Sequence, residues 1–404
     1  MADSPKSEYL FDNRPSEPPA KQELALKKVP IRHRLDLNHQ ILKRLVVKRQ
    51  NFVQWKWDSV NESSRPKNLF FKSLVRASKS ALKTQNLVIK SNGYGIIADA
   101  ELYHISRTLQ KLPYLKSFTL KPIRSSRISD IGLTYVGDGL KKLSHLQKLN
   151  LQFTNYPITD KGLKDLSEGL RRLYCLQEIS LTLSRCANIT DKGFNEVYKG
   201  LKKLVFLKSM SLDFSTRYQF TDQGLENIKK TFRRLVHLQR IRLNFEDCSD
   251  LTNCGIEYLC KGLEKLVNLK SIELNFRVCS KITDQGLFQL RKALGKIGSL
   301  QSINLCFRSC YVITDEGLGN VSGGLKKLVS LRNLEFNFAK CERISDLGLK
   351  ALLENLKGLV SLRRTQIVLD GCYQISCDDQ KKFRRELKVL KGRRARRDRE
   401  ERDG

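Results

Sequence analysis

One seven-residue pattern occurs eight times in the sequence, and this repetition limits the folds that the chain can adopt. Two of its copies are KITDQGL at 281–287 and VITDEGL at 312–318. The glycine of the pattern recurs after a first step of 30 residues and then at steps of 31, at Gly132, Gly162, Gly193, Gly224, Gly255, Gly286, Gly317 and Gly348. A fixed period of about 20 to 50 residues indicates a solenoid, in which each repeat forms one coil that stacks on the next.

Each period predicts one strand followed by one helix. SIELNF at 271–276 alternates apolar and polar side chains, which is the pattern of a half-buried strand. ITDQGLFQLRKALGKI at 282–297 places leucines at helical spacing, and Thr283 or Asp284 can accept hydrogen bonds from the first turn of that helix. We therefore predict about ten parallel strands with centres near Leu87, Phe118, Leu149, Ile179, Met210, Ile241, Ile272, Ile303, Leu334 and Thr365.

Stacking lets the coils bury apolar faces that a single coil would leave exposed. One apolar position of the strand segment recurs in phase, and we predict that its side chains form a continuous core. These residues are Phe153, Leu183, Phe214, Phe245, Phe276, Phe307, Phe338 and Leu369.

The repeat LxxIxLxF…CxxITDxGLxxL resembles leucine-rich repeats, and in particular the cysteine-containing subclass of F-box/leucine-rich-repeat subunits of ubiquitin ligases. The resemblance covers residues 67–380 and implies an α/β fold, a leucine-rich-repeat solenoid (horseshoe) with a curved parallel sheet inside and helices outside. For the in-phase cysteines it implies a buried ladder that bonds to the backbone of the next coil. Those residues are Cys186, Cys248, Cys279, Cys310, Cys341 and Cys372. No F-box pattern with its leading Leu-Pro precedes the repeats.

The charge of the chain is +33, which favours acidic partners such as nucleic acid. Residues 1–30 have no net charge and five prolines, and they predict a disordered N-terminal tail. Residues 31–66 predict a basic helical cap on the first coil. Within this range, residues 41–57 combine aromatic with basic side chains, and the alternative interpretation is that these aromatic rings stack on the bases of a nucleic acid. Residues 381–404 predict a basic C-terminal tail or helix, either a polyanion-binding or nuclear-localisation segment or a solvated terminal helix.

A basic residue or pair follows the end of each predicted helix, and we call these residues the basic ridge. They complement the negative ends of the helix dipoles, by about 0.3–1 kcal/mol each, or they form a rail for RNA, DNA or another polyanion. The ridge consists of Lys141, Lys142, Arg171, Arg172, Lys202, Lys203, Arg233, Arg234, Lys265, Lys296, Lys326, Lys327 and Lys357.

The outward positions of the strands mix acidic and basic groups with short amides, which suits a folded protein partner better than a phosphate backbone. We therefore expect a non-catalytic protein-interaction scaffold, with a nucleic-acid or ribonucleoprotein binder as the alternative. For the scaffold, the resemblance implies the narrower role of a ubiquitin-ligase substrate adaptor. The expected partner site on the concave face consists of Asn150, Asp213, Arg240, Arg242, Asn244, Glu273, Asn275, Asn304 and Asn337.

Other classes of function find no support in the sequence. It has no phosphate loop, nucleophile elbow or metal-ligand spacing, so we expect no enzyme activity, cofactor or metal. A weak dinucleotide-binding match at Gly93, Gly95 and Ala98 lies in phase with the repeat and predicts another helix start. The number of cysteines is odd, 11, and no signal peptide accompanies them, which predicts free thiols and a cytoplasmic or nuclear protein. The sequence has no long apolar run, so we expect no membrane span. We expect the protein to be a monomer outside its complex.

Overall fold

The structure is a computed structural model, and it describes residues 52–57, 85–91, 97–122, 128–215 and 220–389. Contacts divide the chain into two units, residues 1–45 and residues 46–404, and all described residues belong to the second unit. The predicted tail at 1–30 and most of the predicted cap at 31–66 lie outside the described residues.

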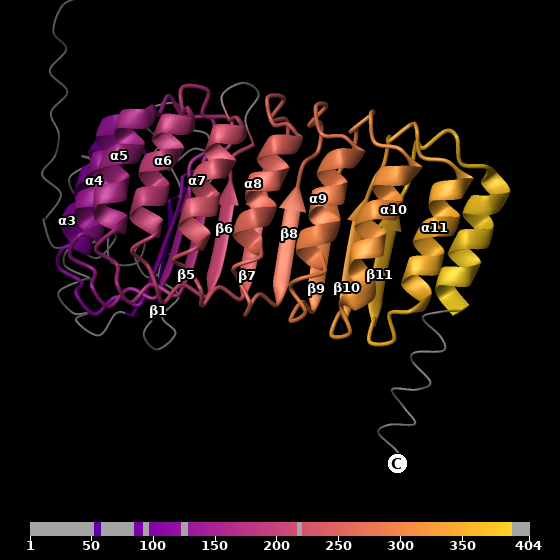
Figure 1. Ribbon diagram of the computed structural model, residues 1–404. Coiled ribbons are helices and arrows are strands. Elements are labelled where there is room, and N and C mark those ends of the chain that lie inside the picture. The colour runs from indigo at the N-terminus through magenta and orange to yellow at the C-terminus, as the bar shows by residue number, and fades with distance from the viewer. Residues whose placement is uncertain (1–51, 58–84, 92–96, 123–127, 216–219, 390–404) are drawn as a thin grey trace, which may run out of the picture. The chain divides into compact units, whose positions relative to one another are not determined.

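One parallel sheet of eleven strands runs through the described residues, with the strands in chain order (Figure 1). The ten predicted strand centres lie in β2 to β11, each as the second residue of its strand, so this prediction is confirmed. The strands are β1 (Phe52–Trp57), β2 (Asn86–Ser91), β3 (Ser117–Lys121), β4 (Lys148–Gln152), β5 (Glu178–Thr182), β6 (Ser209–Asp213), β7 (Arg240–Asn244), β8 (Ser271–Asn275), β9 (Ser302–Cys306), β10 (Asn333–Asn337) and β11 (Arg364–Val368).

A helix follows each strand from β2 to β10, and these helices form one layer on a single face of the sheet (Figure 1). Most of them have the same length, 11 residues, because the repeat fixes both ends. The helices are α3 (Asp99–Leu109), α4 (Asp130–Leu140), α5 (Asp160–Leu170), α6 (Asp191–Leu201), α7 (Asp222–Phe232), α8 (Asn253–Leu263), α9 (Asp284–Leu294), α10 (Asp315–Gly323) with the 3-10 turn η1 (Gly324–Lys327), and α11 (Asp346–Lys357).

The N-terminal prediction is wrong for residues 52–57, which form β1 rather than part of a helical cap. β1 pairs with β2 in parallel, from Phe52 opposite Asn86 to Trp57 opposite Ser91. The segment FVQWKW is rich in β-branched and aromatic residues, which favour a strand, and pairing with it gives β2 a neighbour on its outer edge. At the other end, residues 377–389 are helical, so the C-terminal helix begins before the predicted boundary at 381.

The core lies between the sheet and the helix layer. In β8 the buried and half-buried side chains alternate as predicted, with Ile272 and Leu274 buried. The predicted row of phenylalanines and leucines is buried along its whole length. Rings of neighbouring coils stack, with centroids 5.4 Å apart between Phe245 and Phe276 and 5.5 Å apart between Phe276 and Phe307. The apolar faces of separate coils therefore form one continuous core.

The threonine of the repeated pattern caps its own helix, while the aspartate holds the next coil. At α9, the Thr283 side chain accepts a hydrogen bond from the N–H of Gln285. The Asp284 carboxylate instead accepts the N–H of Thr314 at 2.9 Å and its hydroxyl at 2.7 Å. We call this recurring pair the aspartate ladder. It also joins Asp99 to Ser129, Asp130 to Thr159, Asp160 to Thr190, Asp191 to Thr221, Asp222 to Thr252 and Asp315 to Ser345.

The glycine of the pattern makes room for that aspartate. A Cβ added at Gly317 would collide with Oδ1 of Asp284, and six other glycines of the series face the aspartate of the preceding coil in the same way. At Gly286 the facing residue is Asn253, whose Oδ1 would lie 2.8 Å from the added Cβ. The seven-residue pattern is therefore an interface between coils as well as a helix start.

The in-phase cysteines are buried and free, as the resemblance implied, but they bond to the preceding coil and not to the next one. Cys279 donates its S–H to the carbonyl oxygen of Phe245 at 3.2 Å, and Cys310 donates to that of Phe276 at the same distance. The direction follows from the chain path, because each cysteine comes after its own strand and lies beside the strand end of the coil before it. Burial raises the pKa of Cys310 to about 12 and that of Cys372 to about 11.

Removing one carboxylate of the aspartate ladder should destabilise the protein. In Asp284→Ala, the N–H and hydroxyl of Thr314 lose a charged acceptor, and we expect the free energy of unfolding to fall by about 3 kcal/mol in urea titration. Asp284→Asn is the matched control, since Asn253 already bonds Thr283 at 3.0 Å in the equivalent place, and it should lose clearly less. Equal stability of Asp284→Ala and the parent would contradict the proposed role of the ladder.

Thiol reactivity should separate the cysteines by burial. In the native protein we expect a thiol reagent to modify the exposed Cys175, Cys254 and Cys377 rapidly, Cys306 slowly and the other seven hardly at all. Raising the pH toward about 9 should leave Cys310 unreactive, because burial raises the pKa of its thiol to about 12. Peptide mass mapping after brief labelling gives the readout, with labelling in denaturant as the control for all eleven. Rapid native labelling of Cys310 would contradict its buried position.

Candidate functional site

The sheet face that carries no helix is the predicted concave face, and we call it the open face. Strand alternation places all nine predicted partner-binding residues on it, half-buried or exposed. Strand register then arranges them in adjacent rows that run across the strands. Asn150, Arg242, Glu273 and Asn304 lie in one row, Asp213, Asn244, Asn275 and Asn337 in the next, and Arg240 in a third.

The charged groups of the open face bond to one another across strands. Arg242 on β7 pairs with Glu273 on β8 at 2.7 Å, and the amide of Asn304 on β9 donates to Glu335 on β10 at 2.7 Å. Nearer the β5 side, Glu178 pairs with Lys148 at 3.0 Å. Exposed pairs of this kind contribute little to stability, about 0–1 kcal/mol each, but they hold long side chains in defined positions.

Several amides of the open face have a local task that the sequence did not reveal. The side-chain oxygen of Asn244 accepts the N–H of Glu246 at 3.1 Å, and that of Asn275 accepts the N–H of Arg277 at 3.0 Å. Each closes an Asx turn at the end of its strand, just before a left-handed residue, with φ 65° at Asp247 and 63° at Val278. These asparagines thus shape the turn as well as the surface.

The residues of the basic ridge lie at the ends of the helices, as predicted, and most of them are exposed. Four pair with a carboxylate: Lys141 with Asp138, Arg171 with Glu168, Lys296 with Glu264 and Lys357 with Glu354. The other nine have no ion pair with any described residue. They are Lys142, Arg172, Lys202, Lys203, Arg233, Arg234, Lys265, Lys326 and Lys327.

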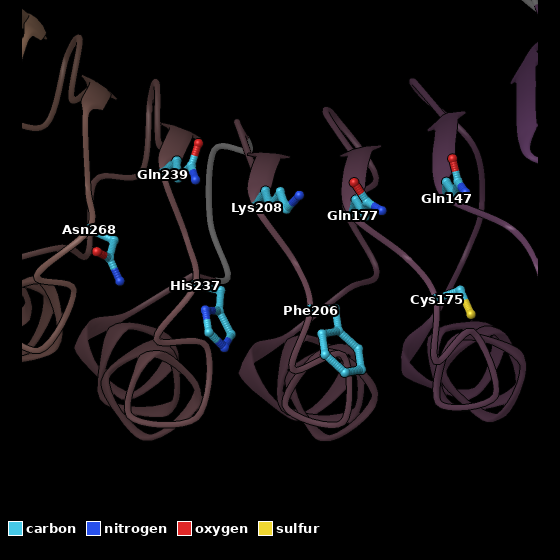
Figure 2. Close-up of a pocket in the computed structure, with 8 residues that line it drawn as sticks. All are labelled: Gln147, Cys175, Gln177, Phe206, Lys208, His237, Gln239 and Asn268. Carbon is cyan, nitrogen blue, oxygen red and sulfur yellow. The ribbon is translucent and has the colours of Figure 1, made fainter.

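Beside the basic ridge runs a groove that sequence reasoning missed, with a volume of about 560 Å³. It is formed by the turns that lead from each helix to the next strand. Figure 2 shows its lining residues in two rows: Gln147, Gln177, Lys208 and Gln239 beside the strands, and Cys175, Phe206, His237 and Asn268 on the helix side.

Apolar side chains are exposed in these same turns. Phe206 is 59% exposed and Val267 70% exposed, whereas the leucines on either side of them in the chain are buried. In the sequence, LVFL at 204–207 looks like a continuous apolar core segment. One signal in the sequence could have revealed that these positions are exposed. Each turn places two variable residues between two buried aliphatic residues, as in LVFL at 204–207 and IGSL at 297–300.

Metal and membrane features are absent from the part of the chain that the structure describes. No group of three or more His, Cys, Asp or Glu residues is arranged to hold a metal ion there. None of the described helices is long and apolar enough to cross a membrane. The glycines of the dinucleotide-binding match, Gly93 and Gly95, lie outside the described residues, and Ala98 is the N-cap of α3.

One comparison with known proteins identifies the repeat. A family model described as a leucine-rich repeat matches residues 142–167. No curated protein matches the sequence significantly. Among solved structures, the yeast Rad7 and Elc1 complex is similar at 18% identity and a TM-score of 0.43, covering 78% of this chain and 85% of that one.

Two further solved structures are similar over a shorter stretch. They are the actin-binding site 2 of leiomodin-1, at 17% identity and a TM-score of 0.32, and the tropomodulin C-terminal domain of Caenorhabditis elegans, at 17% identity and a TM-score of 0.33. Each covers 44% of this chain, with 91% of the leiomodin-1 chain and 97% of the tropomodulin chain matched. Because the matched repeat recurs through the stacked strands and helices described above, the chain is a leucine-rich-repeat protein.

Proposed function

We propose that the protein is a non-catalytic scaffold that binds a folded protein partner on the open face of its sheet. The observation that carries the proposal is the cross-strand network of that face. Its acidic, basic and amide groups already bond to one another, as Arg242 does to Glu273 at 2.7 Å and Lys148 does to Glu178 at 3.0 Å. A polar surface whose side chains are ordered beforehand loses less conformational entropy when a partner binds.

The mixed charge of this face supports a protein partner over a polyanion. From β7 to β10 the face carries both signs, with the basic groups Arg240 and Arg242 on β7 and the acidic groups Glu273 and Glu335 on β8 and β10. A phosphate backbone would meet these carboxylates and be repelled, whereas a protein surface of complementary pattern can match both signs.

Ubiquitin-ligase adaptor function is a narrower form of the same proposal. It rests on the resemblance of the repeats to those of F-box/leucine-rich-repeat subunits. The test is co-purification of the full chain with the adaptor subunit of such a ligase. Absence of that subunit from the purified complex would remove this form and leave the broader proposal standing.

Replacing Arg242 and Glu273 together by serine should weaken partner binding without unfolding the array. Serine already occupies the same row at Ser180 and Ser211, so the strands tolerate it there. Removing both members leaves no unpaired charge, and we expect the thermal midpoint to stay within a few degrees. The captured partner should bind about tenfold more weakly, because arginines near the centre of an interface often dominate its affinity.

The matched control is the double replacement of Asp250 and Lys281 by serine. These residues form another exposed ion pair between neighbouring coils, at 2.7 Å, in the turns that lead from strands to helices and away from the open face. Quantitative mass spectrometry should show the partner retained by this control and lost from the open-face variant. A partner that survives the open-face change, but is lost when residues 1–51 or 390–404 are removed, would contradict the proposal.

A further inference from the structure

Positive charge gathers along one edge of the repeat array. The basic edge comprises nine seven-residue turns that lead from helix to strand, at 110–116, 141–147, 171–177, 202–208, 233–239, 264–270, 295–301, 326–332 and 357–363. Together they contain 19 lysines and arginines and a single carboxylate, that of Glu264.

The opposite edge shows no such excess. Seven turns that lead from strand to helix are described in full, at 154–159, 184–190, 246–252, 277–283, 308–314, 339–345 and 370–376, and they contain six basic and five acidic residues. Helix-dipole chemistry accounts for a basic residue at a helix end, but the basic edge is also positive beyond the ridge. Lys208, Lys270 and Arg332 stand at the far side of the turns, directly before their strands. A second line of positive charge, interrupted by glutamines in four of the nine turns, therefore runs along the strand side, opposite the ridge.

Between the two lines of charge, apolar and aromatic side chains point outward. Tyr114 is 60% exposed, Tyr174 53%, Phe206 59%, Val267 70% and Val329 71%. A surface that binds a ligand through charge alone does not need exposed aromatic rings between its basic residues. Aromatic side chains beside a basic groove are instead the arrangement that receives stacked bases, at about 1–3 kcal/mol per base.

The groove offers unused amides to the same ligand. Gln147, Gln177 and Gln239 are half-buried, and their side chains make no hydrogen bond with any other described residue. The backbone fixes their positions, since the carbonyl oxygen of Gln147 accepts the N–H of Gln177 at 2.8 Å and that of Glu178 at 2.9 Å. Figure 2 shows these glutamines in the row beside the strands, across the groove from the row that contains Phe206 and His237. An amide carries both donors and acceptors, which is what the edge of a base requires.

We propose that the basic edge binds single-stranded nucleic acid, with phosphates on the two lines of charge and bases against Phe206, His237 and the glutamines. The spacing of the coils supports a single strand over a duplex. Neighbouring parallel strands repeat at about 4.8 Å. Bases along one strand of a duplex repeat at roughly 3.4 Å. A nucleic-acid chain that follows the coils is therefore drawn out beyond duplex spacing, and its bases are free to meet the exposed rings. A duplex would present only phosphates and leave the rings and amides unused.

Two local variants of the full chain test the two halves of this proposal. Phe206→Ala removes a stacking ring, and Lys203→Gln with Arg234→Gln removes two unpaired charges. Their matched controls are Tyr373→Ala, which removes a ring that is 79% exposed on the opposite edge, and Lys161→Gln with Lys192→Gln, which removes two exposed charges near helix starts. Every variant keeps the basic segments at 31–66 and 381–404, so differences between variants report on the basic edge.

Binding is measured by fluorescence anisotropy with labelled oligouridine of about 12 nucleotides and with a duplex of the same length. We expect Phe206→Ala to lower the affinity for oligouridine about tenfold at an unchanged salt slope, and to leave duplex binding unaffected. The double glutamine variant should instead reduce the slope of log K against log salt by about 1.4, the value for two phosphate contacts on a single strand. Both controls should bind like the parent.

Three results would overturn the proposal. The first is equal affinity for oligouridine and duplex with no effect of Phe206→Ala, which would mean that the edge attracts phosphates only. The second is the absence of oligouridine binding at about 50 mM salt, where phosphate contacts are strongest. The third is binding of phosphatidylserine vesicles that depends on Phe206 while oligouridine is ignored, which would assign the exposed apolar side chains to a lipid surface. None of these results bears on the open face, so the protein-scaffold proposal stands or falls separately.

Discussion

A carboxylate that reaches from one coil into the helix start of the next is the contact on which the array depends. The carboxylate of Asp284 lies at the start of its own helix, α9, and bonds to the N-cap residue of the next helix, α10. Its negative charge is therefore favourable at the positive dipole ends of both helices. The facing glycine must lack a side chain because the carboxylate occupies that space. Thr314, in turn, caps its own helix while donating backward. One short pattern thereby specifies a helix start, an interface and the spacing between coils.

Much of this architecture could be predicted from the sequence, because the period, the strand alternation and the leucine spacing all describe the same coil. What could not be predicted is which neighbour a residue contacts. Residues in phase carry the same type in every coil, so spacing alone cannot tell whether Asp284 caps its own helix or bonds Thr314. The same ambiguity made the expected direction of the cysteine bonds, to the next coil, wrong. β1 was missed because residues 52–57 lie outside the repeating pattern, where no second copy supports the prediction.

The surfaces were harder to predict than the core, for a physical reason. A buried position tolerates few residue types, so the repeat preserves it, whereas an exposed position varies freely between coils. The exposed Phe206 lies in an apolar segment of the sequence that looks like core, and only the turn geometry shows that the buried leucines anchor it while it points outward. Conversely, Asn244 looks like a surface amide, yet its oxygen closes a turn. Local backbone bonding, which composition cannot express, separates these two cases.

The direction of the aspartate ladder bears on how such a chain can change its length. Every internal helix start takes its acceptor from the coil before it, so each coil is both a recipient and a donor of the same bond. At the last rung Asp346 accepts the N–H of Ser376 at 2.9 Å, while the Ser376 hydroxyl turns to Asp379 within its own helix. At α3, the first helix that the structure describes, Glu101 accepts the N–H of Ala98 at 2.9 Å. Because every internal rung joins the same kind of donor to the same kind of acceptor, duplication or loss of one whole unit within the array restores every contact of the ladder.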